Sequence, residues 1–256
     1  MRWIAVMISS VVVWSICLST VSASFDTDDD GLPDVWEIRI GTDPNAIDSD
    51  GDGYGDGDEV RNGYDPILSA PARLASAIGM LDSDHDGVLD VVELRGGLNP
   101  TTSDTDGDGY ADGIEIAFGY DPLDHRAVRL PQQIVIDTST QELSYYTGPY
   151  EVGRHSVSTG RRISPTPTGA FTIASKQPRA WSSVAHLWMP WWMNFVGSGA
   201  PIGRYGIHEL PVWPNGIQEG ATHLGVPVSG GCVRLGTDAA EALYSWARVG
   251  TTVEIR

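Results

Sequence analysis

Four acidic segments of the sequence have the residue types and the spacing of a cation-binding loop. They are DTDDDGLPDVWE (26–37), DSDGDGYGDGDE (48–59), DSDHDGVLDVVE (82–93) and DTDGDGYADGIE (104–115), and each follows the pattern D-x-D-x-D-G-x-x-D-x-x-E. Carboxylates at positions 1, 3, 5, 9 and 12 around a glycine turn suit a hard divalent ion that takes about six to eight oxygen ligands. We therefore predict calcium ligands at Asp26, Asp28, Asp30, Asp34, Glu37, Asp48, Asp50, Asp52, Asp56, Glu59, Asp82, Asp84, Asp86, Asp90, Glu93, Asp104, Asp106, Asp108, Asp112 and Glu115.

The four segments form two copies of a larger unit. Their starts lie 22, 34 and 22 residues apart, so the pair recurs after 56 residues, together with flanking GYDP motifs at 63 and 119. This pattern indicates an internal duplication. A disordered acidic linker is the alternative, but disorder does not need a glycine at position 6 and a glutamate at position 12 in every copy. Without metal these carboxylates should repel one another, so calcium is expected to be structural.

These loops share their pattern with EF-hands but differ at position 8. EF-hands place a β-branched residue or leucine there, and this chain has Pro33, Gly55, Leu89 and Ala111. The loops are more similar to the thrombospondin type 3-like calcium repeats of exported bacterial proteins, over about residues 25 to 124. The resemblance implies calcium-ordered loops joined by short helical turns, with the region serving as a spacer or tether.

Charge is distributed unevenly along the chain. Residues 24–124 contain 26 of the 34 acidic residues and four arginines, a balance of −22, whereas residues 125–256 contain 11 basic and 8 acidic residues, a balance of +3. Two modules with different electrostatic properties are therefore expected. The acidic module should attract cations and repel nucleic acid and anionic membranes.

The N-terminal residues 1–23 have the layout of a secretory signal peptide. Arg2 precedes an apolar run, and Val21, Ser22 and Ala23 form a small-residue exit. We predict export, cleavage before Ser24, and a location in the periplasm or cell wall. Cys17 would leave with the signal, and no later segment is apolar enough for a membrane span.

Cys232, in PVSGGCVRL (227–235), is then the single cysteine of the mature chain. No intramolecular disulfide is possible, and an unpaired thiol in an oxidising compartment is either buried and inert or used chemically. A thiol needs a base or a lowered pKa to attack an amide, and imidazole is its usual partner. The glycines beside it allow a substrate carbonyl to approach the backbone closely.

The elements that position this cysteine are expected to be mainly β. QQIVID (132–137) and ELSYYT (142–147) predict a hairpin, and residues 150–160, 169–174 and 251–256 continue the strand pattern. Asp238 as N-cap, with Glu241 three residues later, predicts one late helix. In the acidic half, the spacing of Leu74, Ile78 and Leu81 predicts a helix over 70–81.

Five motifs in the second half occur in an order that resembles a known family. VSTG (157–160), TPTGAFTI (166–173), MPWWMNF (189–195), YGIHE (205–209) and VSGGCVRL (228–235) are similar to the YkuD-type L,D-transpeptidase catalytic domain, from about residue 131 to 256. The resemblance implies a β-sandwich enzyme of the bacterial cell wall that requires no cofactor for catalysis. It takes a peptidoglycan tetrapeptide stem, forms a cysteine thioester with loss of the terminal D-alanine, and passes the acyl group to an amine.

The resemblance also implies roles for residues around Cys232. Cys232 corresponds to the nucleophile and His208 to the general base, which also serves as acid toward the leaving amine. Ser229 and Gly230 lie in the nucleophile motif, and the N–H groups of Gly231 and Cys232 are candidates for the oxyanion hole. Arg234 corresponds to an arginine that orients the loop or meets a substrate carboxylate.

Two residues depart from the family pattern. The usual S-H-G-C is S-G-G-C here, with Gly230 in place of histidine, and Glu209 replaces the glycine that usually follows the base. His223 is a candidate to supply an imidazole in place of the missing one. The four tryptophans of WSSVAHLWMPWWMNF (181–195) belong either to the substrate cleft or to the core.

The sequence thus predicts a signal peptide (1–23), duplicated calcium repeats with short helices (24–124), a linker (125–130) and an L,D-transpeptidase domain (131–256). The expected substrate is a peptidoglycan stem peptide, and neither the acceptor nor the oligomeric state can be read from the sequence. Two alternatives stay open. One is a non-catalytic, calcium-dependent protein for cell-wall binding or adhesion, and the other is an L,D-carboxypeptidase that uses water as acceptor.

Overall fold

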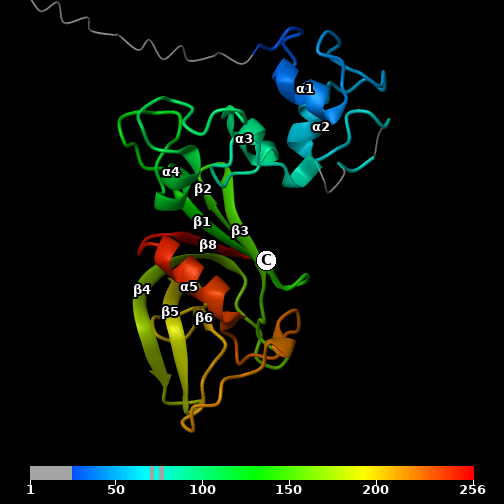
Figure 1. Ribbon diagram of the computed structural model, residues 1–256. Helices are drawn as coiled ribbons and strands as arrows, with labels where there is room; N and C mark the ends of the chain where they lie inside the picture. The colour runs from blue at the N-terminus through cyan, green and yellow to red at the C-terminus, as the bar shows by residue number, and fades with distance from the viewer. Residues whose placement is uncertain (1–24, 70–71, 75–77) are drawn as a thin grey trace, which may run out of the picture.

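The computed structural model describes residues 25–69, 72–74 and 78–256 (Figure 1). Four short helices follow the four acidic loops: α1 (Asp34–Ile40), α2 (Asp56–Asn62), α3 (Asp90–Gly96) and α4 (Asp112–Phe118). Each helix begins at position 9 of its loop and ends before a glycine in the left-handed region, with φ between 78° and 99°. Glycine adopts this conformation without the steric cost of a Cβ atom. We call this part of the chain, residues 25–130, the repeat region.

The helix expected over 70–81 is corrected by the structure. Only a 3₁₀ turn, η1 (Ile78–Met80), is present in the described part of this segment. Arg73 instead forms an isolated β-bridge with Tyr64, and its guanidinium lies 4.8 Å from the Tyr64 ring centroid. This bridge between extended segments outweighs the helical spacing of the apolar residues. Residues 70–71, 75–77 and the signal peptide predicted over 1–23 lie outside the described residues.

Residues 131–256, which we call the sheet region, form the mainly β fold that the sequence predicts. The strands are β1 (Gln132–Asp137), β2 (Glu142–Thr147), β3 (Tyr150–Ser156), β4 (Gly169–Ser182), β5 (Leu187–Gly197), β6 (Gly206–Glu209), β7 (Val233–Leu235) and β8 (Thr252–Ile255). They are hydrogen-bonded in the single order β3-β2-β1-β8-β4-β5-β6-β7. Most neighbours are antiparallel, but β1 with β8 and β6 with β7 are parallel.

One apolar core joins both halves of this sheet. It includes Ile134 of β1, Phe171 of β4, Phe195 of β5 and Val233 of β7. The late helix α5 (Thr237–Trp246) covers it with Ala240, Leu243 and Trp246. The helix starts after Gly236, before the predicted cap Asp238, and no side chain caps it; the Thr237 hydroxyl donates to Glu209 at 2.7 Å.

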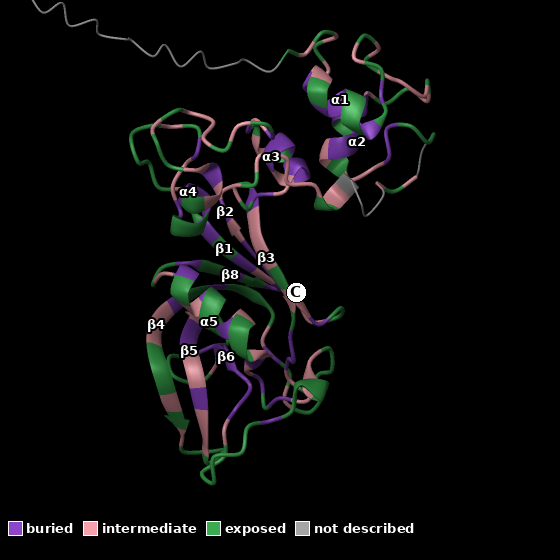
Figure 2. Cartoon of the chain, viewed as in Figure 1, coloured by how far each residue is buried: buried purple, intermediate pink, exposed green. Residues whose placement is uncertain are grey.

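The repeat region packs against the sheet region through α3, α4 and β3. Val88, Leu98 and Ile116 form a buried cluster with Tyr150 of β3. The Thr147 hydroxyl donates to the Ile116 carbonyl at 2.9 Å. Figure 2 shows buried residues in α3, on the repeat side of this contact, and in β1, within the sheet.

No helix among the residues that the structure describes is both long enough and apolar enough to cross a membrane.

Candidate functional site

Cys232 and His208 line one pocket at the end of the sheet. Strand β6 carries His208, and Cys232 immediately precedes β7, which runs parallel to β6 with His208 opposite Arg234. The pocket has a volume of about 430 Å³. Its wall includes Trp181, Trp192, Tyr205, His208, Cys232 and Arg234. The parallel pairing of two short strands thus brings together the two motifs that the sequence singled out.

His208 is buried and held in one tautomer. Its Nδ1 lies 2.5 Å from the backbone carbonyl of Glu209. Because a carbonyl oxygen only accepts, Nδ1 must carry the proton, which leaves Nε2 as the acceptor of the neutral ring. Burial lowers the pKa of His208 to about 3, and the nearby Arg234 acts in the same direction. The ring, packed against Trp192 with centroids 5.8 Å apart, is therefore an unprotonated base at neutral pH.

The Cys232 thiol is subject to opposing influences. Burial raises its pKa, whereas a backbone hydrogen bond from Gly206 and the charge of Arg234 act to lower it. The thiol is therefore the favoured resting form, and a base is needed to generate the thiolate. A neutral imidazole in the same pocket meets that need.

The backbone before Cys232 is fixed by Ser229. The Ser229 hydroxyl donates to the Cys232 carbonyl and accepts from the Gly231 N–H at 3.0 Å. Gly231 has φ +119°, and a Cβ atom there would lie 2.6 Å from the Tyr205 ring. In this structure the Gly231 N–H donates to Ser229 and so does not point to an open oxyanion hole, which is the role predicted for it. The positive φ and the nearby Tyr205 ring nevertheless require a glycine at position 231.

Gly230 differs from Gly231 in this respect. A Cβ atom at Gly230 would meet nothing within 4 Å, and its φ does not lie in the left-handed region. Its carbonyl accepts a hydrogen bond from the Ser164 hydroxyl at 2.8 Å. The backbone thus does not require glycine at position 230, and the missing histidine leaves open space beside the pocket.

Two buried carboxylates brace β6 and β7: Glu209, the last residue of β6, and Glu219, in the loop that joins the two strands. Glu209 accepts hydrogen bonds from Gln218 and Thr237, so its carboxylate is tied to the loop and to α5. Glu219 accepts from Arg234 Nη1, with 2.8 Å to each oxygen, and from His223 Nδ1 at 2.8 Å. His223 therefore contacts Glu219 and is not part of the pocket wall. Glu219 is not among the predicted site residues, because nothing in its sequence spacing marks it.

The four tryptophans of residues 181–195 divide between the two expected roles. Trp181 and Trp192 line the pocket. Trp188 packs against Trp181, with ring centroids 4.9 Å apart, and Trp191 packs against Tyr244 of α5 at 5.1 Å. The pocket therefore has an aromatic wall, supported by a second layer.

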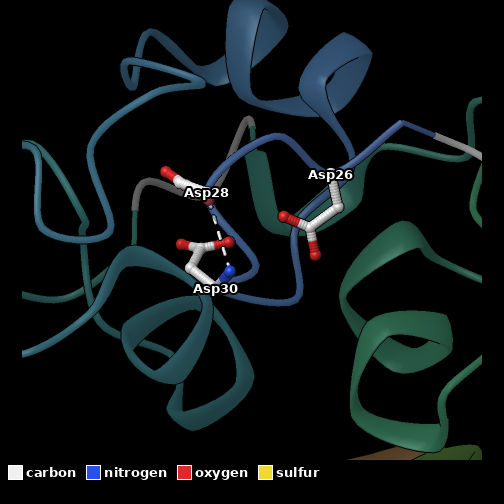
Figure 3. A group of neighbouring side chains, drawn as sticks. All are labelled: Asp26, Asp28 and Asp30. Carbon is white, nitrogen blue, oxygen red and sulfur yellow. Dashed lines mark hydrogen bonds between the residues drawn. The ribbon is translucent and has the colours of Figure 1, made fainter.

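In the repeat region, the first, third and fifth residues of each acidic loop come together. Figure 3 shows this group in the first loop, where carboxylate oxygens of Asp26, Asp28 and Asp30 lie within 4.8 Å of one another. The other three loops contain the same group. The clusters are Asp48, Asp50 and Asp52; Asp82, Asp84 and Asp86; and Asp104, Asp106 and Asp108.

These loops also contain buried oxygens that have no hydrogen-bond partner among the described residues. In every loop they include one oxygen at position 3 and at least one oxygen of the position-12 glutamate. They belong to Asp28, Asp50, Asp84, Asp106, Glu37, Glu59, Glu93 and Glu115. A buried, unpaired carboxylate oxygen is costly, and a bound cation removes that cost. This donor set fits calcium.

Burial also raises the pKa of the four position-12 glutamates, with the neighbouring aspartates adding to the effect. The pKa rises to about 7 for Glu37, Glu59 and Glu115, and to about 9 for Glu93. A positive charge close to such a carboxyl group lowers its pKa and favours the ionised form. The electrostatics therefore agree with the unpaired oxygens.

The position-9 aspartates, which the sequence predicts as ligands, also make hydrogen bonds within their loops. Asp34, Asp56, Asp90 and Asp112 each accept two hydrogen bonds from the position-2 residue, one from its N–H and one from its hydroxyl. Both oxygens are thus used to close the loop, although Asp56 also lies near Asp30 and Glu37. The serine or threonine at position 2 of all four loops was the sequence signal for this role.

Protein-family models match both the region that contains Cys232 and His208 and the region that contains the acidic loops. Residues 131–255 match the L,D-transpeptidase catalytic domain (YkuD). Residues 26–46, 48–68 and 104–125 match the bacterial TSP3 repeat. The third loop, 82–93, is outside these matches but has the same aspartate cluster. No curated protein matched the sequence.

Several solved structures are similar to about half of this chain. An L,D-transpeptidase from Mycobacterium smegmatis is 19% identical with a TM-score of 0.42, and covers 50% of this chain and 60% of its own. One from Stackebrandtia nassauensis is 25% identical with a TM-score of 0.39, covering 49% and 55%. One from Mycobacterium tuberculosis H37Rv is 20% identical with a TM-score of 0.42, covering 50% and 59%. This chain therefore spans less than two thirds of each.

The chain combines bacterial TSP3 repeats with a domain of the YkuD family, the L,D-transpeptidase catalytic domain.

Proposed function

We propose that this protein is an exported peptidoglycan L,D-transpeptidase in which Cys232 is the nucleophile and His208 the base. The observation that carries the proposal is the fixed tautomer of His208, whose Nε2 is an unprotonated acceptor in the pocket that Cys232 lines. Family membership supports peptidoglycan as the substrate. We propose the domain limits of the sequence analysis unchanged, with the linker at 125–130.

The proposed reaction has two acyl transfers. Nε2 of His208 takes the thiol proton, the sulfur attacks the carbonyl carbon before the terminal D-alanine, and the carbonyl oxygen becomes an oxyanion. The N–H of Cys232 is proposed as the backbone donor to that oxyanion, because the Gly231 N–H is engaged by Ser229. Collapse returns the proton to the leaving amine and leaves a thioester.

In the second transfer an acceptor amine attacks the thioester carbonyl. His208 accepts the proton of the attacking amine and returns it to the departing sulfur, so that the free thiol is restored. Water in place of the amine gives the carboxypeptidase. The apolar wall of Trp181 and Trp192 favours an amine by limiting the access of water.

Calcium is proposed as a structural ion of the repeat region. The ligands are the aspartates at positions 1, 3 and 5 and the glutamates at position 12. The position-9 aspartates hold the loops closed around the ion. A bound calcium supplies positive charge to the buried oxygens at positions 3 and 12.

A second candidate function is a non-catalytic module for cell-wall binding. The observation in its favour is Gly230, where the family's histidine is absent and space is left beside the nucleophile. In that case the pocket would bind a stem peptide without forming a covalent bond.

Intact-mass spectrometry of the calcium-loaded protein with a disaccharide tetrapeptide or a carbapenem tests the proposal. We expect an adduct that is absent from Cys232→Ala and slowed at least about a hundredfold in His208→Ala, in line with the usual contribution of a general base. Glu151→Gln on β3 is the control, because Glu151 pairs with Arg154 away from the pocket. No adduct from folded wild type, together with equal ligand binding by Cys232→Ala, would favour the binding module.

A further inference from the structure

Among the residues that the structure describes, Glu219 is the carboxylate partner of Arg234 beside the proposed active site. Arg234 Nη1 lies 2.8 Å from both Glu219 oxygens, and only 14% of the arginine side chain and 7% of the glutamate side chain are exposed. His223 Nδ1 approaches the same Oε1 at 2.8 Å and is 45% exposed. Glu219 is therefore a buried acceptor shared by a cation of the pocket wall and a surface imidazole.

Arg234 is placed to act on Cys232. It lies two residues after the cysteine, lines the same pocket and stands opposite His208 in the register of β6 and β7. Its positive charge favours the thiolate of Cys232 and disfavours the imidazolium of His208. A carboxylate bonded to this arginine reduces the positive charge that reaches both groups.

We propose that Glu219 is a positioning residue that holds the Arg234 guanidinium in the pocket wall and limits the positive charge acting on Cys232, with His223 tuning this effect through the shared Oε1. The inference rests on the proposed function in treating Cys232 as the nucleophile. Its electrostatic part concerns the thiol itself, and can be measured without turnover.

The other ionisable groups around the thiol do not neutralise Arg234. Among the described residues, the pocket wall contains His208 from β6, Arg204 and Tyr205 from the segment before β6, and Arg234 from β7. The carboxylate of Glu209 accepts from Gln218 and Thr237. Glu219 is thus the acidic group in direct contact with a cation of the pocket wall.

The test is the rate at which iodoacetamide alkylates Cys232 as a function of pH, followed on the Cys232 peptide by mass spectrometry. Glu219→Gln removes the negative charge while keeping the size of the side chain. We expect alkylation at pH 7 to become about three- to tenfold faster and the pH profile to move to lower pH, because Arg234 is no longer neutralised. Glu151→Gln removes the same charge from the Arg154 pair on β3 and should leave the profile unchanged.

Two further variants separate this role from a merely structural one. Arg234→Gln should slow alkylation, and in that background Glu219→Gln should have no further effect on the rate, because Glu219 acts through Arg234. His223→Ala should slow alkylation slightly, by about twofold, because Oε1 loses a donor and neutralises Arg234 more fully. The opposite signs of Glu219→Gln and His223→Ala are the signature of the proposal.

Superimposable pH profiles for wild type and Glu219→Gln, with native near-ultraviolet circular dichroism, would overturn the inference. If Glu219→Gln does not fold, an unchanged rate in Arg234→Gln overturns it equally, since the arginine would then have no influence on the thiol. The mass-spectrometric adduct assay gives an independent outcome. Wild type that forms no adduct but whose alkylation responds to Glu219→Gln would refute the enzyme and leave the electrostatic inference intact.

Discussion

The two repeat pairs have matching sequences but different neighbours in the structure. Residue i of the first pair corresponds to residue i + 56 of the second, so α1 corresponds to α3 and α2 to α4. The first pair packs on α3 through a cluster that includes Trp36, Ile40 and Leu94. The second pair packs on the sheet region through Tyr150. Duplication therefore produced a stack, in which each unit supports the next.

The last residue of the first helix in each pair shows how the copies diverged. In α1 this residue is Ile40, a buried part of the apolar cluster. Its equivalent in α3 is Gly96, where a Cβ atom would lie 1.9 Å from the Tyr150 ring. The Tyr150 hydroxyl also donates to the Gly96 carbonyl at 3.2 Å. The second copy thus has no side chain at this position, which leaves room for Tyr150 of the sheet region.

Arginine caps repeat the same arrangement at the ends of α2 and α4. Arg95 from α3 donates to the Arg61 carbonyl in α2. Arg248, after α5, donates to the Phe118 carbonyl at the end of α4 at 3.0 Å. In each case a cation from the next unit satisfies carbonyls at a helix C-terminus. The sheet region therefore contacts the second pair in much the same way as the second pair contacts the first.

Of the changes considered, calcium chelation should have the largest effect on the stability of the two repeat pairs. With the ion removed, the unpaired carboxylates of all four loops repel one another, and each site loses about 2.7 kcal/mol if calcium had been present at 100 times its dissociation constant. We expect amide exchange to accelerate first in α1 and α2, then in α3 and α4, which are also held by the sheet region. Strands β1 and β8 should stay protected.

Equal loss of protection in both pairs would contradict the supporting role of the sheet region. Unchanged protection of all four helices after chelation would contradict the calcium assignment itself. Magnesium at the same concentration is the control, because its smaller shell and reluctance to lose water suit these loops poorly.

Acidification of the calcium-free protein should recover part of this loss. The pKa of Glu37, Glu59 and Glu115 is raised to about 7 and that of Glu93 to about 9, all from 4.5. Below pH 4.5 these glutamates are protonated in both the folded and the unfolded chain, so their raised pKa does not reduce the stability of the fold. As the pH rises the folded chain loses stability, and this loss is complete above pH 7, or above pH 9 for Glu93. Thermal unfolding of the calcium-free repeats should therefore shift to higher temperature from pH 8 to pH 5. A shift in the opposite direction would exclude these glutamates as its source.

A methyl group at Gly96 tests the contact that distinguishes the two pairs. Gly96→Ala places Cβ against the buried Tyr150 ring, and we expect it to cost about 2 kcal/mol, within the usual range for overpacking. Gly79→Ala is the matched control, since nothing lies within 4 Å of its Cβ and its φ is not positive. Urea unfolding with calcium present measures both. Equal midpoints would mean that Tyr150 moves aside at no cost.

The sequence predicted the repeats and the domain family of this protein better than it predicted the contacts between distant residues. The spacing of the acidic loops and the order of five short motifs were enough for the repeats and the catalytic fold, because both are local patterns. The contact of Gly96 with Tyr150 joins residues 54 positions apart, and no periodicity marks it. Glu219 was missed for a similar reason, since its partners are fixed only when β6 and β7 pair. The position-9 aspartates differ from Glu219, because their partners are local. The loop pattern marks them as ligands, and in the structure each accepts two hydrogen bonds from the position-2 residue of the same loop.

The smallest expected effect comes from Thr147, at the junction of the second pair and the sheet region. Its buried hydroxyl donates to the Ile116 carbonyl and accepts from Trp246 Nε1 at 3.1 Å, so one side chain links α4 to α5. Thr147→Val keeps the shape but leaves the Trp246 Nε1 donor unpaired and removes one of the two hydrogen bonds to the Ile116 carbonyl, which should cost about 1 to 2 kcal/mol. Thr172→Val, at an exposed position of β4, is the control. If the cost at Thr147 persists after chelation, then this link belongs to the sheet region alone, whereas its loss with calcium removed would mean that α4 has left the junction and that calcium holds it there.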